Sequence, residues 1–203
     1  MTYVCDFDGT VATRDLGAAL LARYGRPSWH LWDTLATRGI LPLQLAQTLQ
    51  WHGVQAPLST LRAEALRVAQ LRPGLQEFLG RAHEHSRQVI IVSSGFTVYI
   101  DAVLGRLARH VAGIIANQLV PTKNGYQITW APSRYACKNH RPCKAAVVSQ
   151  LSGPAVLIGD GLSDTCGLDT TATVYAVEGS LLARRARARQ RTVTEFTDFQ
   201  AVA

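Results

Sequence analysis

Short apolar runs recur along the chain, and most of them are followed by a segment in which apolar residues return at helical spacing. Short runs bounded by turn residues are typical of buried strands, and the longer period is typical of amphipathic helices. Alternating strands and helices predict a parallel sheet with right-handed crossovers. The fold class is therefore α/β, with strands predicted at residues 2–7, 89–92, 154–159, 173–179 and 191–196.

The segment between the first two strands has a helical pattern from about residue 16 to residue 70. Helices are predicted at 16–25, which ends in Gly25, at 43–51 and at 59–71. Ser59 is a suitable N-cap for the last of these, because a serine hydroxyl can accept a hydrogen bond from a free helix amide. The helices come in one block, so we expect them to form a small insertion in the α/β core.

The remainder of the chain returns to mixed elements. A Ser-Ser-Gly turn is predicted after the second strand, and helices are predicted at 75–85, 96–110 and 142–151. Residues 113–130 have the pattern of a β-hairpin whose arms flank Lys123-Asn124-Gly125. Asn-Gly is the favoured pair for such a tight turn.

Composition restricts the class of protein further. The chain has 203 residues with 47% hydrophobic content, which suits one medium domain, or a core domain with a small insert. No apolar run approaches the roughly 20 residues that a bilayer span needs. The N-terminus shows no basic start, apolar stretch and cleavage site of a secretion signal. We therefore expect a cytoplasmic protein that does not enter a membrane.

The net charge of +7 allows two interpretations. Such an excess can attract nucleic acid, or it can steer an anionic substrate toward the protein. Much of it lies in one short segment, so we favour a solvated helix face over a nucleic-acid interface. The residues concerned are Arg184, Arg185, Arg187, Arg189 and Arg191.

The four cysteines are Cys5, Cys137, Cys143 and Cys166. A cytoplasmic chain keeps thiols reduced, so no disulfide framework is expected. Cys137, His140 and Cys143 have a spacing that suits zinc, but the sequence offers no obvious fourth ligand. Whether these three residues bind a metal is left open.

Reactive side chains follow three of the predicted strands. Asp6 and Asp8 lie at the end of the strand at 2–7, Ser93 follows the strand at 89–92, and Asp160 and Asp164 follow the strand at 154–159. The carboxyl ends of parallel strands meet at one edge of a sheet, so these groups should lie together. Gathered carboxylates are costly unless a cation neutralises them. We expect Mg²⁺, bound by Asp6, the backbone carbonyl of Asp8, and Asp160.

Chemistry on a phosphate ester fits these groups. Asp6 can act as the nucleophile that forms an aspartyl-phosphate, and Asp8 can protonate the leaving group and later activate water. Lys144 can supply positive charge for the phosphoryl group. Ser93 and the amides of Ser94 and Gly95, expected at a helix start, can bind phosphate oxygens. Thr10 is expected to hydrogen-bond Asp8, and Asp164 to hold a metal-bound water or to orient Lys144.

These groups form four motifs in a fixed order: DFDGT, SSG, the lysine that opens a helix, and GDGLSD. In this order the chain resembles the haloacid-dehalogenase-like phosphatases over nearly its whole length. The resemblance implies a Rossmann-like core formed by residues 1–14 and 73–203, with a small helical cap at 15–72. It also implies a Mg²⁺-dependent phosphatase of the subclass that includes phosphoserine phosphatase.

Within this family, the chain is most similar to the methionine-salvage branch. The resemblance lies in CDFDGTVATRD including Asp15, in the hairpin followed by ITW, in IGDGLSD, and in the tail VTEFTDF. It implies 2-hydroxy-3-keto-5-methylthiopentenyl-1-phosphate as the substrate. Ser94 departs from the family, which usually has glycine there.

Other functions stay open at this point. The Cys-bearing segment before Lys144 is also similar to enzymes acting on phosphoethanolamine and phosphocholine, and phosphoserine is a further candidate substrate. A phosphotransferase and a non-enzymatic nucleic-acid-binding module are less favoured alternatives. The sequence does not indicate an oligomeric state.

Overall fold

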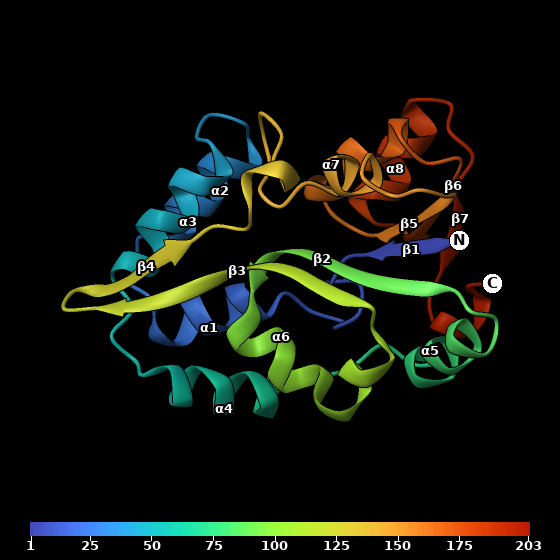
Figure 1. Cartoon of the computed structure of the whole chain (residues 1–203). Coiled ribbons are helices and arrows are strands. Elements are labelled where there is room, and N and C mark those ends of the chain that lie inside the picture. The colour runs from blue at the N-terminus through green and yellow to red at the C-terminus, as the bar shows by residue number, and fades with distance from the viewer.

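The centre of the structure, a computed structural model that describes residues 1–203, is a seven-stranded sheet (Figure 1). The strand order is β4-β3-β2-β1-β5-β6-β7, and every neighbouring pair is parallel except β3 and β4. This confirms the predicted α/β class. The strands are β1 (Thr2–Cys5), β2 (Gln88–Phe96), β3 (Gly113–Thr122), β4 (Gly125–Thr129), β5 (Ala155–Gly159), β6 (Thr173–Val177) and β7 (Thr194–Phe196).

Helices cover both faces of the sheet. In Figure 1, α5 and α6 lie below it and α7 and α8 lie above it. Tyr3 packs edge-on against Phe78 of α5, whereas its neighbour Val4 packs with Val147 of α7. Successive strand residues point to opposite faces, so a strand covered on both sides must be apolar throughout. These helices are α5 (Leu75–Glu84), α6 (Thr97–Leu104), α7 (Lys144–Val148) and α8 (Leu181–Ala188).

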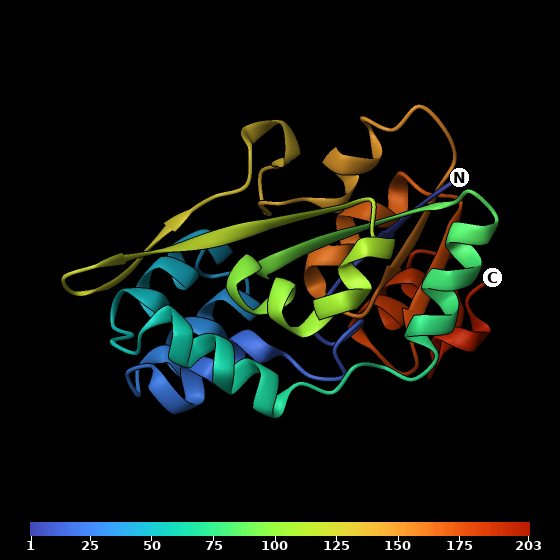
Figure 2. The same ribbon diagram turned by 60° about the horizontal axis from the view of Figure 1, so that its bottom comes forward.

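Four further helices lie between β1 and α5. Figure 2 shows them gathered at the end of the molecule away from both termini. An isolated bridge between Ala12 and Leu71 joins the two ends of this segment. Its α3 packs against β4 and its α4 against α6. The division into a core and a cap at residues 15–72 stays a prediction. The helices are α1 (Leu16–Tyr24), α2 (Trp29–Thr37), α3 (Leu43–His52) and α4 (Leu58–Val68).

Two differences from the sequence prediction concern the helices of this segment. The sequence prediction did not include α2, in which only Trp29 is buried, although its apolar residues do recur at helical spacing. The prediction of Ser59 as an N-cap is wrong, because α4 begins one residue earlier, at Leu58, after Pro57. Proline already has the backbone φ angle that a helix start needs, and its missing amide costs nothing there.

The predicted Ser-Ser-Gly turn after β2 is also wrong. Strand β2 continues through Ser93, Ser94 and Gly95 to Phe96, with a shift of register against β3 between Val92 and Phe96. The extra residues let the strand bend at its carboxyl end, as β-bulges do. Helix α6 therefore begins only at Thr97, and its predicted C-terminal part is the 3₁₀ helix η1 (Gly105–His110).

The hairpin of β3 and β4 is confirmed, with a shifted turn. Thr122 pairs with Gly125, so Lys123 and Asn124 form the two-residue turn. Gly125 has a φ of 125°, and a Cβ there would collide with the His52 carbonyl oxygen, so only glycine fits. The first half of β3 pairs with β2, which the sequence did not predict. The hairpin is thus an extension of the main sheet.

Arginines in α8 and directly after it bind acidic side chains and a backbone carbonyl of neighbouring segments. Arg189 lies 3.0 Å from Asp169 and Arg191 donates to the Thr171 carbonyl, while Arg187 pairs with Glu195. Their contacts hold η3 (Leu162–Asp169) and β7 beside α8.

None of the helices combines the length and the apolar composition that a membrane span requires.

Candidate active site

Three carboxylates meet at the carboxyl edge of the sheet. Asp6 directly follows β1 and Asp160 directly follows β5, and these two strands are parallel neighbours with Cys5 paired to Ile158. Asp164 lies one turn into η3. Each of the three offers an oxygen within 4.8 Å of the others. The pairing of β1 with β5 thus brings together acids that are more than 150 residues apart in the sequence.

Lys144 lies beneath this cluster. It is the first residue of α7, it is fully buried, and its Nζ is 2.5 Å from Asp6 Oδ1 and 2.6 Å from Asp164 Oδ1. Burial alone would lower its pKa, but the two carboxylates outweigh burial and raise it, so the ammonium stays charged. Asp164 is fixed in turn by the amides of Asp160 and Gly161, which donate to its Oδ2. Of the two roles considered for Asp164, this geometry matches the orientation of Lys144.

One ammonium does not balance three acids. Burial, with the nearby Asp164 and Asp160, raises the pKa of Asp6 well above its ordinary value despite the opposing effect of Lys144. Burial and then Asp164 raise the pKa of Asp160 to about 6. Burial is the largest cause of both shifts, and the neighbouring carboxylates add to it. A single ammonium beside three carboxylates leaves the site short of positive charge. Hard carboxylate oxygens are the ligands that Mg²⁺ prefers, so this donor set fits that ion.

Asp8 lies outside the three-acid cluster and has different partners. Its Oδ1 accepts from the Leu16 amide at 2.9 Å and its Oδ2 from the Tyr99 hydroxyl at 2.7 Å. Burial, and then the neighbouring charge of Asp15, raise the pKa of Asp8 to about 8. A carboxyl group with such a pKa holds a proton at neutral pH. No local pattern pointed to Tyr99, which looks like an ordinary core residue of α6.

The loop after Asp8 is held differently from the prediction. Thr10 donates to Asp160 Oδ1 at 2.9 Å, so the expected hydrogen bond to Asp8 is wrong. The reason is the backbone turn at Gly9, where φ is +80° and a Cβ would collide with the Asp160 carboxylate. This close approach places Thr10 beside Asp160. Arg72, which the sequence analysis missed, donates to the carbonyls of Gly9 and Thr10 at 2.6 and 2.7 Å.

The end of β2 supplies the predicted phosphate-binding groups. Ser93 Oγ accepts from the Gly95 amide at 2.9 Å. The Ser94 carbonyl accepts from Asn117 of β3 at 3.0 Å and from Gln47 of α3 at 2.9 Å. The amides of Ser94 and Gly95 therefore belong to a bent strand, and their predicted place at a helix start is wrong. Gln47 and Asn117 had no recognisable motif in the sequence.

A cavity of about 1170 Å³ opens over this edge. Asp6, Asp8 and Asp160 line it, as do Ser93, Ser94 and Gly95. The helical segment contributes Asp15, which caps α1 by accepting from the Ala18 amide, together with apolar residues. Lys144, Thr10 and Asp164 lie behind the surface and support the residues that line the cavity. The apolar lining residues from the helical segment include Trp29, Ile40, Leu41 and Trp51.

Comparison with known proteins identifies the class. The family model of haloacid dehalogenase-like hydrolases matches residues 3–169, so the chain belongs to this family. It is similar to the 2-hydroxy-3-keto-5-methylthiopentenyl-1-phosphate phosphatase of Brevibacillus brevis, at 26% identity over 100% of this chain and 93% of the relative. The protein of the same description from Microcystis aeruginosa is 30% identical, over 79% of this chain and 76% of its own.

Solved structures agree on the fold. A phospho-aspartyl intermediate analogue of phosphoserine phosphatase aligns with a TM-score of 0.75 and 14% identity, covering 99% of this chain and 96% of its own. Together with the family match and the curated relatives, this makes the protein a phosphatase that acts on a small phosphate-containing substrate.

The contacts of Arg72 predict that its replacement by lysine slows catalysis. The same replacement at Arg81, a matched arginine, should leave catalysis unchanged. Arg72→Lys removes bonds to the Gly9 and Thr10 carbonyls, because one ammonium cannot reproduce the guanidinium fork. We expect the free energy of unfolding to fall by about 1–3 kcal/mol. Hydrolysis of p-nitrophenyl phosphate should slow by about 10- to 100-fold, because the loop that carries Asp8 shifts.

Arg81→Lys is the control. Arg81 donates to the carbonyls of Phe199 and Val202, far from the site, so this variant should lose similar stability but keep its activity. Urea unfolding and steady-state kinetics measure the two effects. Equal activity in both variants would show that Arg72 does not position the loop.

Proposed function

We propose that the protein is a Mg²⁺-dependent phosphomonoesterase that works through an aspartyl-phosphate on Asp6. The observation that carries the proposal is the position of Asp6. It lies at the floor of the cavity, bound to Lys144 and surrounded by Asp160 and Asp164. Membership of a hydrolase family supports the same reaction class.

The first step is transfer of the phosphoryl group to Asp6. A carboxylate oxygen of Asp6 attacks phosphorus, and the bond to the leaving oxygen breaks. Lys144, bound to Asp6 Oδ1, holds the carboxylate in place and offsets the negative charge that enters with the phosphate. Ser93 lies on the same cavity wall, and its hydroxyl, which accepts from the Gly95 amide, can donate to a phosphoryl oxygen.

Asp8 acts as the general acid in the first step and as the general base in the second. Its carboxyl group gives a proton to the departing alkoxide in the first step. In the second step the resulting carboxylate takes a proton from water, which attacks phosphorus and releases inorganic phosphate from Asp6. The bonds from Tyr99 and the Leu16 amide keep Asp8 in one orientation for both transfers.

The side chains of Asp6 and Asp160 and the backbone carbonyl of Asp8 would hold Mg²⁺. When bound, the ion neutralises charge on the phosphoryl oxygens and on the gathered acids. Asp164 and Thr10 support these groups from behind through Lys144 and Asp160.

Asp6→Asn should abolish turnover. An amide is a poor nucleophile, so we expect kcat for p-nitrophenyl phosphate with Mg²⁺ to fall by roughly 10³-fold or more. Acid-quenched wild-type enzyme should carry one phosphoryl group on the peptide that contains Asp6, as measured by mass spectrometry. Asp101→Asn, an exposed acid of α6, serves as the control and should behave like the wild type. A phosphorylated peptide elsewhere would remove Asp6 as the nucleophile.

Asp8→Asn should have an effect that depends on the leaving group. Alkoxides need a proton to depart, so phosphorylation of the enzyme by an alkyl phosphate should slow by about 10²- to 10⁴-fold. The p-nitrophenolate ion leaves without taking up a proton. Phosphorylation of the enzyme by p-nitrophenyl phosphate should therefore slow by less than about tenfold. Rapid-quench measurement of phosphoenzyme formation separates the two. Equal slowing for both esters would mean that Asp8 is not the acid.

The leading substrate is 2-hydroxy-3-keto-5-methylthiopentenyl-1-phosphate. Two relatives, which match this chain at 26% and 30% identity, are named as phosphatases of this compound. The substrate has an apolar thioether tail, and Trp29, Ile40 and Leu41 present apolar surface in the same cavity as Asp6. Phosphoserine, phosphoethanolamine and phosphocholine carry charged groups in place of this tail.

Substrate preference can be measured directly. We expect kcat/KM for the thioether enol-phosphate to exceed that for phosphoserine, phosphoethanolamine and phosphocholine by at least about tenfold, roughly the contribution of a buried apolar group. Phosphate release with Mg²⁺ present is the assay, and p-nitrophenyl phosphate is the control for the reaction class. Higher kcat/KM for phosphoserine would refute the substrate and leave the phosphatase intact.

A further inference from the structure

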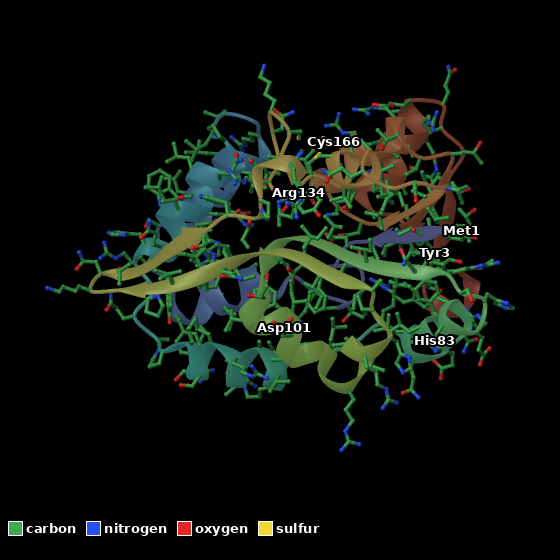
Figure 3. All side chains as sticks on the ribbon, viewed as in Figure 1. Met1, Tyr3, His83, Asp101, Arg134 and Cys166 are labelled. Atoms are coloured by element: carbon green, nitrogen blue, oxygen red, sulfur yellow. The ribbon has the colours of Figure 1, made fainter.

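Thiols and an imidazole gather beside the active-site cavity, outside the catalytic groups. Cys137 and His140 lie in the loop between β4 and α7, and Cys166 comes from η3, 26 residues beyond His140. One donor atom from each of the three lies within 4.8 Å of the others. The sequence showed only the Cys137-His140-Cys143 spacing, without a fourth ligand. Folding supplies that ligand as Cys166, which Figure 3 shows on the side of the sheet that carries α7 and α8.

The distances agree with ligands around one ion. His140 Nδ1 is 3.2 Å from Cys166 Sγ and 4.0 Å from Cys137 Sγ, and the two sulfurs are 4.0 Å apart. Tetrahedral zinc, with Zn–S of about 2.3 Å and Zn–N of about 2.0 Å, would separate two sulfurs by about 3.8 Å and a sulfur from a nitrogen by about 3.5 Å. The three side chains are therefore already spaced as zinc ligands.

Cys143 is the candidate for the fourth position. It is fully buried as the residue before α7, and it lies three residues beyond His140 on the same loop. The donor atoms that lie within 4.8 Å of one another belong to Cys137, His140 and Cys166, so zinc binding by Cys143 requires its sulfur to move toward them. Three thiols and one imidazole are a common ligand set of structural zinc.

Neither a disulfide nor an ordinary apolar core accounts for the cluster as well as zinc does. A disulfide needs sulfurs about 2.05 Å apart, whereas Cys137 and Cys166 are separated by 4.0 Å and all four cysteines are free. An ordinary apolar core would not gather two thiols around the nitrogen of a buried histidine. Thiolate and imidazole ligands also favour zinc over Mg²⁺, so the site is chemically separate from the carboxylates.

We infer that Cys137, His140, Cys143 and Cys166 form a structural zinc site that joins the loop before α7 to η3. The two joined elements hold the buried ion pair of the active site, because Lys144 directly follows Cys143 and Asp164 lies two residues before Cys166. Zinc at this position fixes Lys144 and Asp164 relative to each other. Asn139 and His140 also line the cavity, so the site fixes part of the cavity wall.

The test uses the full-length protein produced in zinc-supplemented medium and purified without chelator. We expect about one zinc per chain by elemental analysis, as for a four-ligand structural site. Protein loaded with Co²⁺ in its place should show sulfur-to-cobalt charge transfer and the intense visible bands of tetrahedral thiolate-bound cobalt. Mg²⁺ in excess should not remove these bands, because it binds carboxylates.

Variants locate the ligands. Cys166→Ser and His140→Ala should each lose most of the bound zinc, whereas the matched controls Cys5→Ser and His85→Ala should retain it. Removal of zinc with a strong chelator should lower the Tm of the wild type by about 5 °C or more, given that 1 kcal/mol moves the Tm of a chain this size by about 2–4 °C. In Cys166→Ser, the chelator should change Tm little.

Three outcomes would overturn the inference. The first is wild-type protein with far less than one zinc per chain. The second is cobalt-loaded protein with only the weak spectrum of oxygen-ligated cobalt. The third is a wild-type Tm that the chelator leaves unchanged. The first two measurements use wild-type protein alone, so they remain decisive even where a variant fails to fold.

Discussion

The ion pair between Lys144 and the carboxylates of Asp6 and Asp164 is the interaction on which the rest of the site depends. It is buried, and it joins the end of β1, the start of α7 and the first turn of η3. A buried charge without its partner costs several kcal/mol, so each of these elements must be in place for the others to be stable. The pair thus fixes the position of Asp6, the residue at the floor of the cavity.

The same pair leaves the site short of positive charge. Lys144 balances one of the neighbouring acids, and burial together with the remaining carboxylates raises the pKa values of Asp6 and Asp160. In the proposed mechanism a divalent cation offsets this deficit, which lets a phosphate group approach the cavity floor. Asp8 does not share the charge of Lys144, because Tyr99 and the Leu16 amide hold its side chain apart from the three-acid cluster. Two aspartates that are separated by one residue thereby acquire different chemistry.

The polar side chains around the site bind mainly to backbone carbonyl groups. Arg72 binds the carbonyls of the loop after Asp8, and Asn117 and Gln47 bind the carbonyl of Ser94. Backbone carbonyls buried at a cavity edge need donors, and these long polar side chains reach them from distant elements. The cysteine cluster around Cys166 adds a comparable connection between the loop before α7 and η3. Each contact restrains a loop that carries a reactive group.

The local pattern of the sequence determined the α/β class, the acids after the strands, and Lys144 at the start of a helix. Strand and helix periods are local properties, and parallel strands must place their carboxyl ends at one edge. Only the tertiary structure decided that Thr10 bonds to Asp160, that β2 continues through Ser94, and that Cys166 joins the thiols. Those outcomes depend on contacts between segments far apart in the chain, which no local spacing encodes.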